Sequence, residues 1–177
     1  MTETVCPDRW SSLSRSAHRL HGAKSITAAI DILRGAARQI AGADCVTIAL
    51  REGDYVSFVG DETIAPLWTG KRFPIHECAS GLAMLERRTI IIPDVRNDAR
   101  VPHNAYLSTF VSSMAIFPVG NGEPVVAIAV YWRERRRVDD EAMILLTTLT
   151  QSAGATFEHL QVLADAERKR FEFRGAA

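Results

Sequence analysis

Cysteine pairs, long apolar runs and an excess of charge are all scarce in this 177-residue sequence. Its three cysteines, Cys6, Cys45 and Cys78, lie far apart and form neither a CxxC motif nor a disulfide framework. Reduced thiols in the cytosol are the simplest interpretation. No run of about 18 apolar residues is present, so we expect no transmembrane helix. The N-terminus lacks the basic and apolar segments of a signal peptide. We therefore expect a cytoplasmic protein without a membrane partner.

The charges balance, since 21 basic and 21 acidic residues give a net charge of zero with histidine neutral. Nucleic-acid binding needs a basic field, which this composition does not supply. The basic run at residues 133–137 (RERRR) has no interleaved aromatic residues that could stack on bases. We interpret it as a solvated connection and expect no nucleic-acid partner.

Two helices and a hairpin are predicted in the first third of the chain. Residues 10–20 place Trp10, Leu13, Ala17 and Leu20 on one helical face. A second helix runs from an N-cap at Ser25 to residue 41, where the following glycine can take a left-handed conformation. Residues 45–50 and 55–59 read as paired strands around a tight turn.

The middle of the chain, residues 73–132, organises the rest. Residues 72–75 form a short strand that must lie at an edge or end of the sheet, because Pro74 cannot donate to a ladder. A helix at 79–86, a buried strand at 89–92 and a short helix at 104–110 follow. Two apolar strands, 113–119 and 125–132, are joined by Gly-Asn-Gly, a strong hairpin signal. An α+β fold with an antiparallel sheet flanked by helices accounts best for this order.

The last predicted helix runs from about residue 139 to 171. Its apolar residues repeat at four-three spacing, which is typical of an interface between helices: Ala142, Leu146, Leu149, Ala153, Thr156, Leu160 and Leu163. We expect a homodimer through this seam and expect the end of the helix to leave the domain. The predicted organisation is an N-terminal helical extension (1–22), one domain (23–164) and a helix end or linker (165–177).

Several short motifs in order resemble those of a GAF domain. They are residues 73–75 (FPI), 78–84 (CASGLAM), 92–95 (IPDV), 100–106 (RVPHNAY) and 110–119 (FVSSMAIFPV). The resemblance covers roughly residues 25–163, and more narrowly the pattern looks like the GAF domains of bacterial sensor histidine kinases and related signalling proteins. It implies a GAF/PAS-like central antiparallel sheet of five or six strands with long N- and C-terminal helices. It also implies a ligand pocket over one face of the sheet and dimerisation through the terminal helices.

The residues that we expect to line this pocket come from the loops and short helices over the sheet and from its last hairpin: Trp68, Phe73, His76, Cys78, Asp94, His103, Tyr106 and Phe117. Bilin-binding relatives carry a Cys-His pair about where Pro102 and His103 stand here. Because the attachment cysteine is missing, covalent bilin is not expected, and a lone histidine does not indicate haem. The cofactor is left open, and no metal site is predicted.

Each candidate also has a purely structural interpretation. His103 either contacts a ligand, or caps the helix or bonds a loop carbonyl. Asp94 either accepts hydrogen bonds from a ligand or His103, or bonds backbone N–H groups two residues on, which we favour. Trp68 and Tyr106 suit a lid or a core equally. Cys78 is either a reactive thiol near an imidazole or a small buried apolar side chain, and the second is favoured.

Three functional hypotheses follow. The first is a sensor that binds a small molecule non-covalently and passes a change in helix packing to an output partner, such as a kinase in a two-component system. The second is a module that only dimerises, with its pocket filled by side chains. The third is an enzyme similar to free methionine sulfoxide reductases, which use several cysteines. We recognise no catalytic constellation, so the first hypothesis is preferred and enzymatic activity is not expected.

Overall fold

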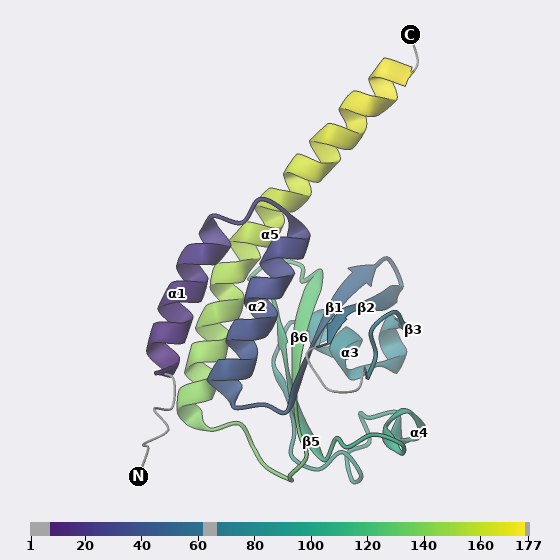
Figure 1. Cartoon of the computed structure of the whole chain (residues 1–177). Coiled ribbons are helices and arrows are strands. Elements are labelled where there is room, and N and C mark those ends of the chain that lie inside the picture. Colours follow the sequence, from purple (N-terminus) through teal and green to yellow (C-terminus); the bar gives the residue numbers. More distant parts are fainter. Residues whose placement is uncertain (1–7, 62–66, 176–177) are drawn as a thin grey trace.

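The computed structural model of the chain describes residues 8–61 and 67–175. In these residues a six-stranded antiparallel sheet has three long helices on one face and short helices on the other (Figure 1). The predicted α+β fold is therefore confirmed. Within the same residues no helix combines the length and the apolarity needed to cross a membrane. Cys6 and part of the loop that follows the first hairpin lie outside the described residues.

The sheet contains β1 (Cys45–Glu52), β2 (Tyr55–Asp61), β3 (Arg72–Pro74), β4 (Ile90–Ile92), β5 (Ser113–Pro118) and β6 (Val126–Trp132). Its strand order is β3-β2-β1-β6-β5-β4, and all neighbours pair antiparallel. As predicted, the strand with Pro74 lies at an edge. The two hairpins β1–β2 and β5–β6 meet through β1 and β6, so the centre of the sheet joins residues far apart in the sequence.

The two faces of the sheet are buried in different cores. On β6, Val130 and Trp132 face the long helices, while Ala129 and Tyr131 face the short helices. Successive strand residues point to opposite faces, so one strand contributes to both cores. Every residue of β6 is buried, which explains why this strand reads as a continuous apolar run.

The helical layer consists of α1 (Arg9–His21), α2 (Ile26–Ala41) and α5 (Asp140–Gly175). The predicted caps of α2 are confirmed: the Ser25 hydroxyl accepts from the Ala28 backbone N–H at 3.1 Å, and Gly42 has φ 56°. The predicted apolar face of α1 is partly wrong, because Trp10 is 55% exposed. Ser12 and Ser16 are buried instead, and their small side chains let α1 approach its neighbours closely. The Ser12 hydroxyl donates to Oε1 of Gln39 on α2 at 3.0 Å.

The four-three seam of α5 is buried inside its own domain as far as Leu160, whereas Leu163 is 48% exposed. Ala142, Leu146, Leu149 and Ala153 are fully buried in the core between the helices and the sheet, and the Thr156 hydroxyl donates to a backbone carbonyl of α1 at 3.3 Å. The prediction that these buried residues join two copies is therefore wrong, while a homodimer through the terminal helices stays a prediction. The physical reason is that the same apolar stripe is needed to pack α5 on its own sheet and on two adjacent helices as would be needed to pack it on a helix of a second copy.

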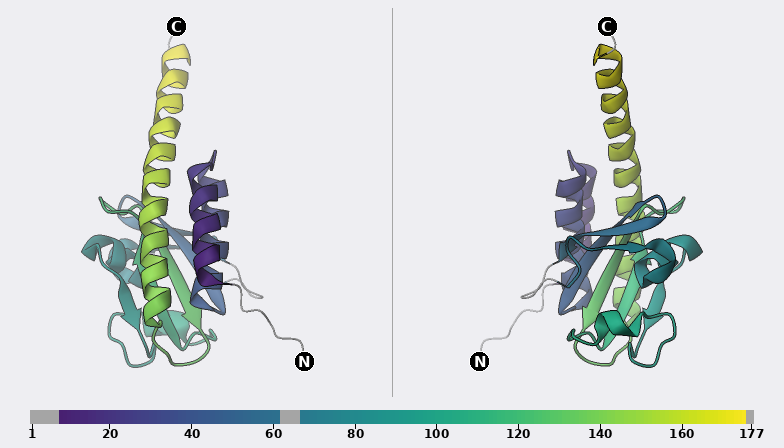
Figure 2. Two further views of the ribbon diagram at one scale, coloured as in Figure 1. Left: turned by 90° about the vertical axis from the view of Figure 1, so that its left-hand side faces the viewer. Right: turned by 90° about the vertical axis from the view of Figure 1, so that its right-hand side faces the viewer.

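The end of α5 leaves the domain, as predicted. The helix has 36 residues and is therefore about 54 Å long. Two views at right angles to Figure 1 show its C-terminal part projecting beyond the sheet and the other helices (Figure 2).

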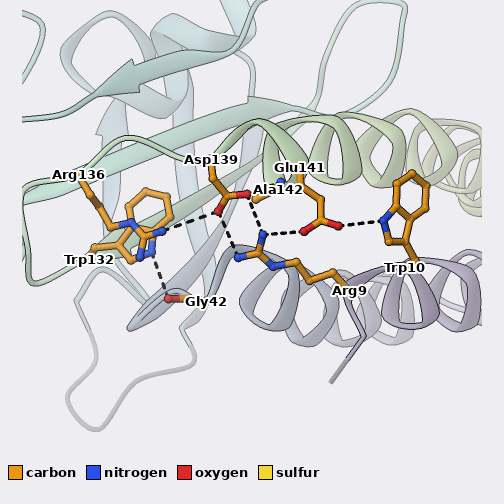
Figure 3. A network of polar contacts seen from close by, with 8 residues as sticks. All are labelled: Arg9, Trp10, Gly42, Trp132, Arg136, Asp139, Glu141 and Ala142. Atoms are coloured by element: carbon orange, nitrogen blue, oxygen red, sulfur yellow. Dashed lines mark hydrogen bonds and ion pairs between the residues drawn. The ribbon is translucent and has the colours of Figure 1, made fainter. Parts of the chain in front are cut away.

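A polar network ties α1 to the start of α5 (Figure 3). The Arg9 guanidinium donates to both carboxylate oxygens of Asp139 at 2.7 and 3.2 Å and to Glu141 at 3.1 Å. Asp139 also accepts from the Ala142 backbone N–H at 2.9 Å and so caps α5. Burial raises the pKa of Asp139, but the bonds from Arg9 and Ala142 outweigh it and lower that pKa. Exposed Trp10 donates to Glu141 at 3.0 Å.

Candidate ligand-binding site

The face of the sheet opposite the long helices is covered by η1 (Ile75–Glu77), α3 (Ala79–Glu86) and α4 (His103–Tyr106). The helix α3 begins where the Cys78 sulfur accepts from the Gly81 backbone N–H at 3.3 Å. Gly81 lies so close to the preceding turn that a Cβ there would be 1.9 Å from the carbonyl oxygen of Ile75. Only glycine permits this approach, which holds the start of α3 against η1.

Four aromatic rings pack together under α4. Trp68 lies 5.0 Å from Tyr106, 6.0 Å from Phe73 and 6.4 Å from Phe58, and Phe58 and Phe73 are 5.8 Å apart, all between ring centroids. Three of these pairs are edge-to-face, the arrangement that aromatic quadrupoles favour, and the Phe58–Trp68 pair is tilted at 49°. The rings leave a hollow of about 20 Å³, which has room for about one water molecule. We call it the inner pocket; its lining residues are Phe58, Trp68, Phe73, Cys78, Pro102, Ala105 and Tyr106.

A larger hollow of about 440 Å³ lies on the other side of α4. Its size is within the range of small-molecule sites. We call it the outer cleft; its lining residues are Val95, Arg96, His103, Tyr106, Leu107, Thr109 and Val111. It combines apolar walls with a guanidinium, an imidazole and a hydroxyl, which is the mixture that binds and orients small molecules.

The Tyr106 hydroxyl reaches down to the sheet. It donates to the sulfur of Met114 at 3.6 Å. Burial raises the pKa of Tyr106, the nearby Cys78 thiol raises it further, and a hydrogen bond with the Tyr131 hydroxyl opposes both. The Tyr131 hydroxyl in turn lies 3.1 Å from the Thr47 hydroxyl, fully inside the protein. A short chain of neutral hydroxyls therefore lies beneath the aromatic rings.

His103 is exposed at the start of α4. Its Nε2 lies 3.1 Å from the Asp98 backbone oxygen, so the predicted bond to a loop carbonyl is present. Arg100 fixes the same loop, because its guanidinium donates to the Asp98 carboxylate and, at 2.9 Å, to the Ile91 carbonyl on β4. The loop contact and the position on the outer cleft coexist, so His103 has one ring nitrogen that the loop does not use.

Asp94 has the structural role that the sequence favours. Its carboxylate accepts from the Arg96 backbone N–H, two residues on, at 3.1 Å, and from the Asn97 amide at 2.7 Å. Arg135 lies 3.2 Å away. The Asn97 hydrogen bond, with smaller contributions from the Arg96 N–H and Arg135, lowers the pKa of Asp94 against the effect of desolvation. Asp94 therefore stabilises the turn after β4.

Cys78 is buried, and this burial raises the pKa of its thiol, against the effect of the backbone N–H of Gly81. A raised pKa keeps the sulfur protonated and unreactive. His76, by contrast, is exposed on η1. Across residues 8–61 and 67–175 no group of three or more His, Cys, Asp or Glu side chains could hold a metal ion.

The structure thus brings together Trp68, Phe73, Cys78 and Tyr106 at the inner pocket. His103 joins Tyr106 at the outer cleft. The placement of Phe117 with this group is wrong: it lies on the opposite face of the sheet, in the core under the long helices. On β5 the residues that face the candidate site are its neighbours Met114 and Ile116, because strand side chains alternate.

Sequence reasoning missed several lining residues: Phe58, Val95, Arg96, Leu107, Thr109, Val111 and the buried Tyr131 beneath them. Phe58 could have been found, because the alternation of residues 55–59 puts it on the same face as buried Val56. The residues after α4 have no periodic pattern, so nothing in the sequence assigned them to a cleft.

The arrangement just described is a sheet with terminal helices on one face and a small-molecule-sized hollow on the other. The pattern of the GAF domain family matches residues 23–158. The chain belongs to the GAF domain family. Among proteins of curated function, none matches this sequence. The narrower resemblance to sensor histidine kinases stays a prediction.

Solved structures with the same fold are distant in sequence from this GAF domain. The GAF domain of a phosphoenolpyruvate-protein phosphotransferase from Coxiella burnetii has a TM-score of 0.79 at 14% identity, covering 92% of this chain and 99% of that chain. The free methionine-R-sulfoxide reductase from Neisseria meningitidis, in complex with its substrate, has a TM-score of 0.75 at 13% identity, covering 92% of this chain and 96% of that chain. The chromophore-binding domain of an unusual bacteriophytochrome from R. palustris has a TM-score of 0.74 at 15% identity, covering 93% of this chain and 64% of that chain. At these identities the likeness shows the fold alone.

Proposed function

We propose that this GAF domain is a cytoplasmic sensor that binds a small molecule non-covalently and has no enzymatic activity of its own. The observation that carries the proposal is the outer cleft of about 440 Å³, where Arg96, His103 and Thr109 face apolar walls. These groups can hydrogen-bond a polar part of a ligand while Val95, Leu107 and Val111 contact an apolar part. A site of this kind binds without needing a covalent bond.

Binding without catalysis is supported by the state of Cys78. A thiol-based reductase needs an accessible thiolate. Here the sulfur is buried, its pKa is raised, and it accepts a hydrogen bond at the start of α3. Cys45 is also buried. The reductase-like hypothesis therefore has no support from the two thiols of the described residues.

We infer that the signal leaves through α5, paired with α5 of a second copy. With its apolar seam buried, α5 presents a different stripe outward: Ile144, Thr148, Ser152, Ala155, His159 and Val162 are all exposed. None of these residues is Asp, Glu, Lys or Arg, and they recur at intervals of three and four, so they lie on one helical face. Exposed Trp10 on α1 flanks the stripe through its bond to Glu141. A groove of about 540 Å³ between α1 and α5 includes Ser152, Ala155 and His159.

A parallel dimer on this stripe would bring the two projecting ends of α5 together, where isolated helices would be marginal. An output domain, of a histidine kinase or of another signalling protein, would then sense a change in the angle or register of the paired helices. A ligand would bias that change only to the extent that it prefers one arrangement.

The second candidate is a module that only dimerises, and the small volume of the inner pocket, about 20 Å³, favours it. The two candidates differ in what the outer cleft does. If the module only dimerises, substitutions in the cleft change neither bound mass nor helix packing.

Native mass spectrometry of the protein after incubation with a bacterial metabolite extract tests the proposal. We expect a retained small-molecule mass on the wild type that Arg96→Ala and His103→Ala each reduce at least about tenfold, since a hydrogen bond to a charged group contributes about 1.5–3 kcal/mol. Arg88→Ala is the matched control, because Arg88 is an exposed arginine paired with Glu86 outside the cleft. No retained mass, or equal retention by all variants, would refute binding in the outer cleft and leave the dimerisation module.

A further inference from the structure

Tyr106 separates the two hollows. Among the described residues it is the one side chain that lines both the inner pocket and the outer cleft. Its ring stands edge-on to Trp68 at 5.0 Å, and its hydroxyl reaches Met114 at 3.6 Å. Without this side chain the two hollows would join.

The inner pocket suits a neutral aromatic ring. Its described lining consists of the aromatic side chains Phe58, Trp68 and Phe73, the thiol of Cys78, and two small apolar residues. No charged side chain is among them. Hydrogen-bonding capacity next to this lining is provided by the hydroxyl of Tyr131, which bonds the Tyr106 hydroxyl. The Tyr106 side chain, itself a phenol, already packs beside this space, with its ring 5.0 Å from that of Trp68.

The segment that carries Tyr106 is bonded mainly to itself. The Ala105 N–H donates to the Pro102 carbonyl at 2.9 Å, and Thr109 donates to the Tyr106 carbonyl from its N–H at 3.0 Å and from its hydroxyl at 2.9 Å. The His103 ring bonds the Asp98 carbonyl. All these bonds join residues 98–109 to one another, so they would survive if the segment moved as a unit.

Both ends of the segment are fixed to the sheet. Arg100 donates to the Ile91 carbonyl on β4 at 2.9 Å, and the Ser112 N–H donates to the Trp132 carbonyl on β6 at 2.9 Å. Between these points α4 has four residues, and Pro102 gives it no side-chain cap. Leu107, directly after Tyr106, is 79% exposed. An outward movement of α4 therefore costs chiefly the contacts of the Tyr106 side chain and its apolar neighbours.

We propose that Tyr106 is a displaceable partition, and that a neutral, phenol-like ligand enters through the outer cleft and takes the place of its side chain in the inner pocket. This inference rests on the proposed function as a small-molecule sensor and names the class of ligand that passes from the outer cleft into the inner pocket. The ligand ring packs against Trp68, and its hydroxyl bonds the Tyr131 hydroxyl. The apparent affinity is lowered by the fraction of molecules in which Tyr106 closes the pocket.

The test uses p-cresol, which is the tyrosine side chain as a free compound. The chain has three tyrosines, so protein labelled with 3-fluorotyrosine gives one fluorine resonance for each. Tyr55 is 43% exposed and Tyr131 is 1% exposed, so they serve as exposed and buried references. We expect saturating p-cresol to move the Tyr106 resonance toward solvent, seen as a new sensitivity to exchange of H₂O for D₂O, while Tyr131 stays protected.

Affinities measured by calorimetry supply the second readout. Tyr106→Phe keeps the ring but loses the hydroxyl contacts that hold it closed, so it should bind p-cresol about fivefold more tightly than the wild type. Tyr106→Ala removes the partition and should bind at least about tenfold more tightly than the wild type. If Tyr106→Ala does not fold, the Tyr106 resonance of the wild type and the affinity of Tyr106→Phe for p-cresol still test whether Tyr106 is displaced.

Three results would overturn the partition: saturation by p-cresol with Tyr106 still protected, equal affinities in the wild type and the variants, or no binding to the wild type at 1 mM. The proposed function fails by a different result, namely the absence of any retained compound that depends on Arg96 and His103. A compound retained in the cleft while Tyr106 stays protected would refute the partition alone.

Discussion

Gly154→Ala tests the contact through which α5 lies on the turn between β5 and β6. A Cβ on Gly154 would lie 2.3 Å from the Cα of Gly120 and 3.0 Å from its nitrogen. Gly120 has φ 93°, and its N–H donates to the Thr150 carbonyl at 3.2 Å. Both sides of the contact are backbone, so no flexible side chain can move aside.

Two opposing effects set the magnitude. Alanine is better than glycine in a helix interior by about 1 kcal/mol. Against this, carbon atoms in contact prefer a separation of about 3.5–4.0 Å, so α5 must move by roughly 1 Å while its seam stays packed in the core. Overpacking of this kind costs about 1–3 kcal/mol, and the rigid backbone on both sides puts Gly154 at the upper end. We expect a net loss of about 2 kcal/mol, or roughly 4–8 °C in Tm for a chain of this size.

Gly35→Ala is the matched control. Gly35 also lies inside a helix, α2, but nothing is within 4 Å of a Cβ added there. It gains the helix preference without the clash, so its stability should rise by about 1 kcal/mol. Urea unfolding followed by circular dichroism measures both variants. If Gly154→Ala proved as stable as the wild type while Gly35→Ala gained stability, the close approach of α5 and the turn would be refuted.

Three further predictions concern the thiol, the helices and the α1–α5 network. In folded protein Cys78 should react with iodoacetamide at least about 100-fold more slowly than in urea, as measured by peptide mass, because it is buried with a raised pKa. Leu149→Asp should lower the free energy of unfolding by about 4 kcal/mol, since it buries an unpaired charge in the core. Ile144 is exposed, so Ile144→Asp should keep the melting temperature and instead dissociate a dimer in sedimentation. Equal losses of stability in the two variants would contradict the assignment of the two faces of α5. Arg9 lowers the pKa of Asp139 below its usual 3.8 despite burial. The stability that this pair contributes is therefore present above about pH 4 and is lost as pH falls through the lowered pKa. Asp139→Asn removes that contribution, so the urea midpoints of the variant and the wild type should differ above about pH 4 and converge near pH 2.

Features set by the backbone chemistry of single residues could be predicted from the sequence. Ser25 caps α2 because a hydroxyl accepts from an orphan N–H, and Gly42 ends it because glycine takes positive φ freely. Pro74 requires an edge strand because it has no N–H. None of these depends on what the element packs against, so each prediction holds in the structure.

Features set by packing partners could not be predicted in the same way. On β5 and β6 both faces are buried, so hydrophobicity does not say which face carries the site, and Phe117 was placed on the wrong one. The four-three spacing of α5 is equally suited to a second copy and to the chain's own sheet. The outer cleft is formed by loop residues such as Arg96 and Thr109, whose positions follow from the Asp94 turn and the short α4 rather than from any repeat.

The two-sided burial of the sheet also gives the shortest physical route from the site to α5. Met114 contacts the Tyr106 hydroxyl on one face of β5, and the next residue, Ala115, packs into the helical core on the other. Because side chains of one strand alternate between faces, a shift of β5 that follows displacement of Tyr106 must change the packing on the helix side as well. The contact of Gly120 with Gly154 carries the end of the same hairpin directly onto α5. A ligand that fills the outer cleft but leaves Tyr106 and β5 in place would not use this route, so a sensor without the partition would have to reach α5 through other contacts.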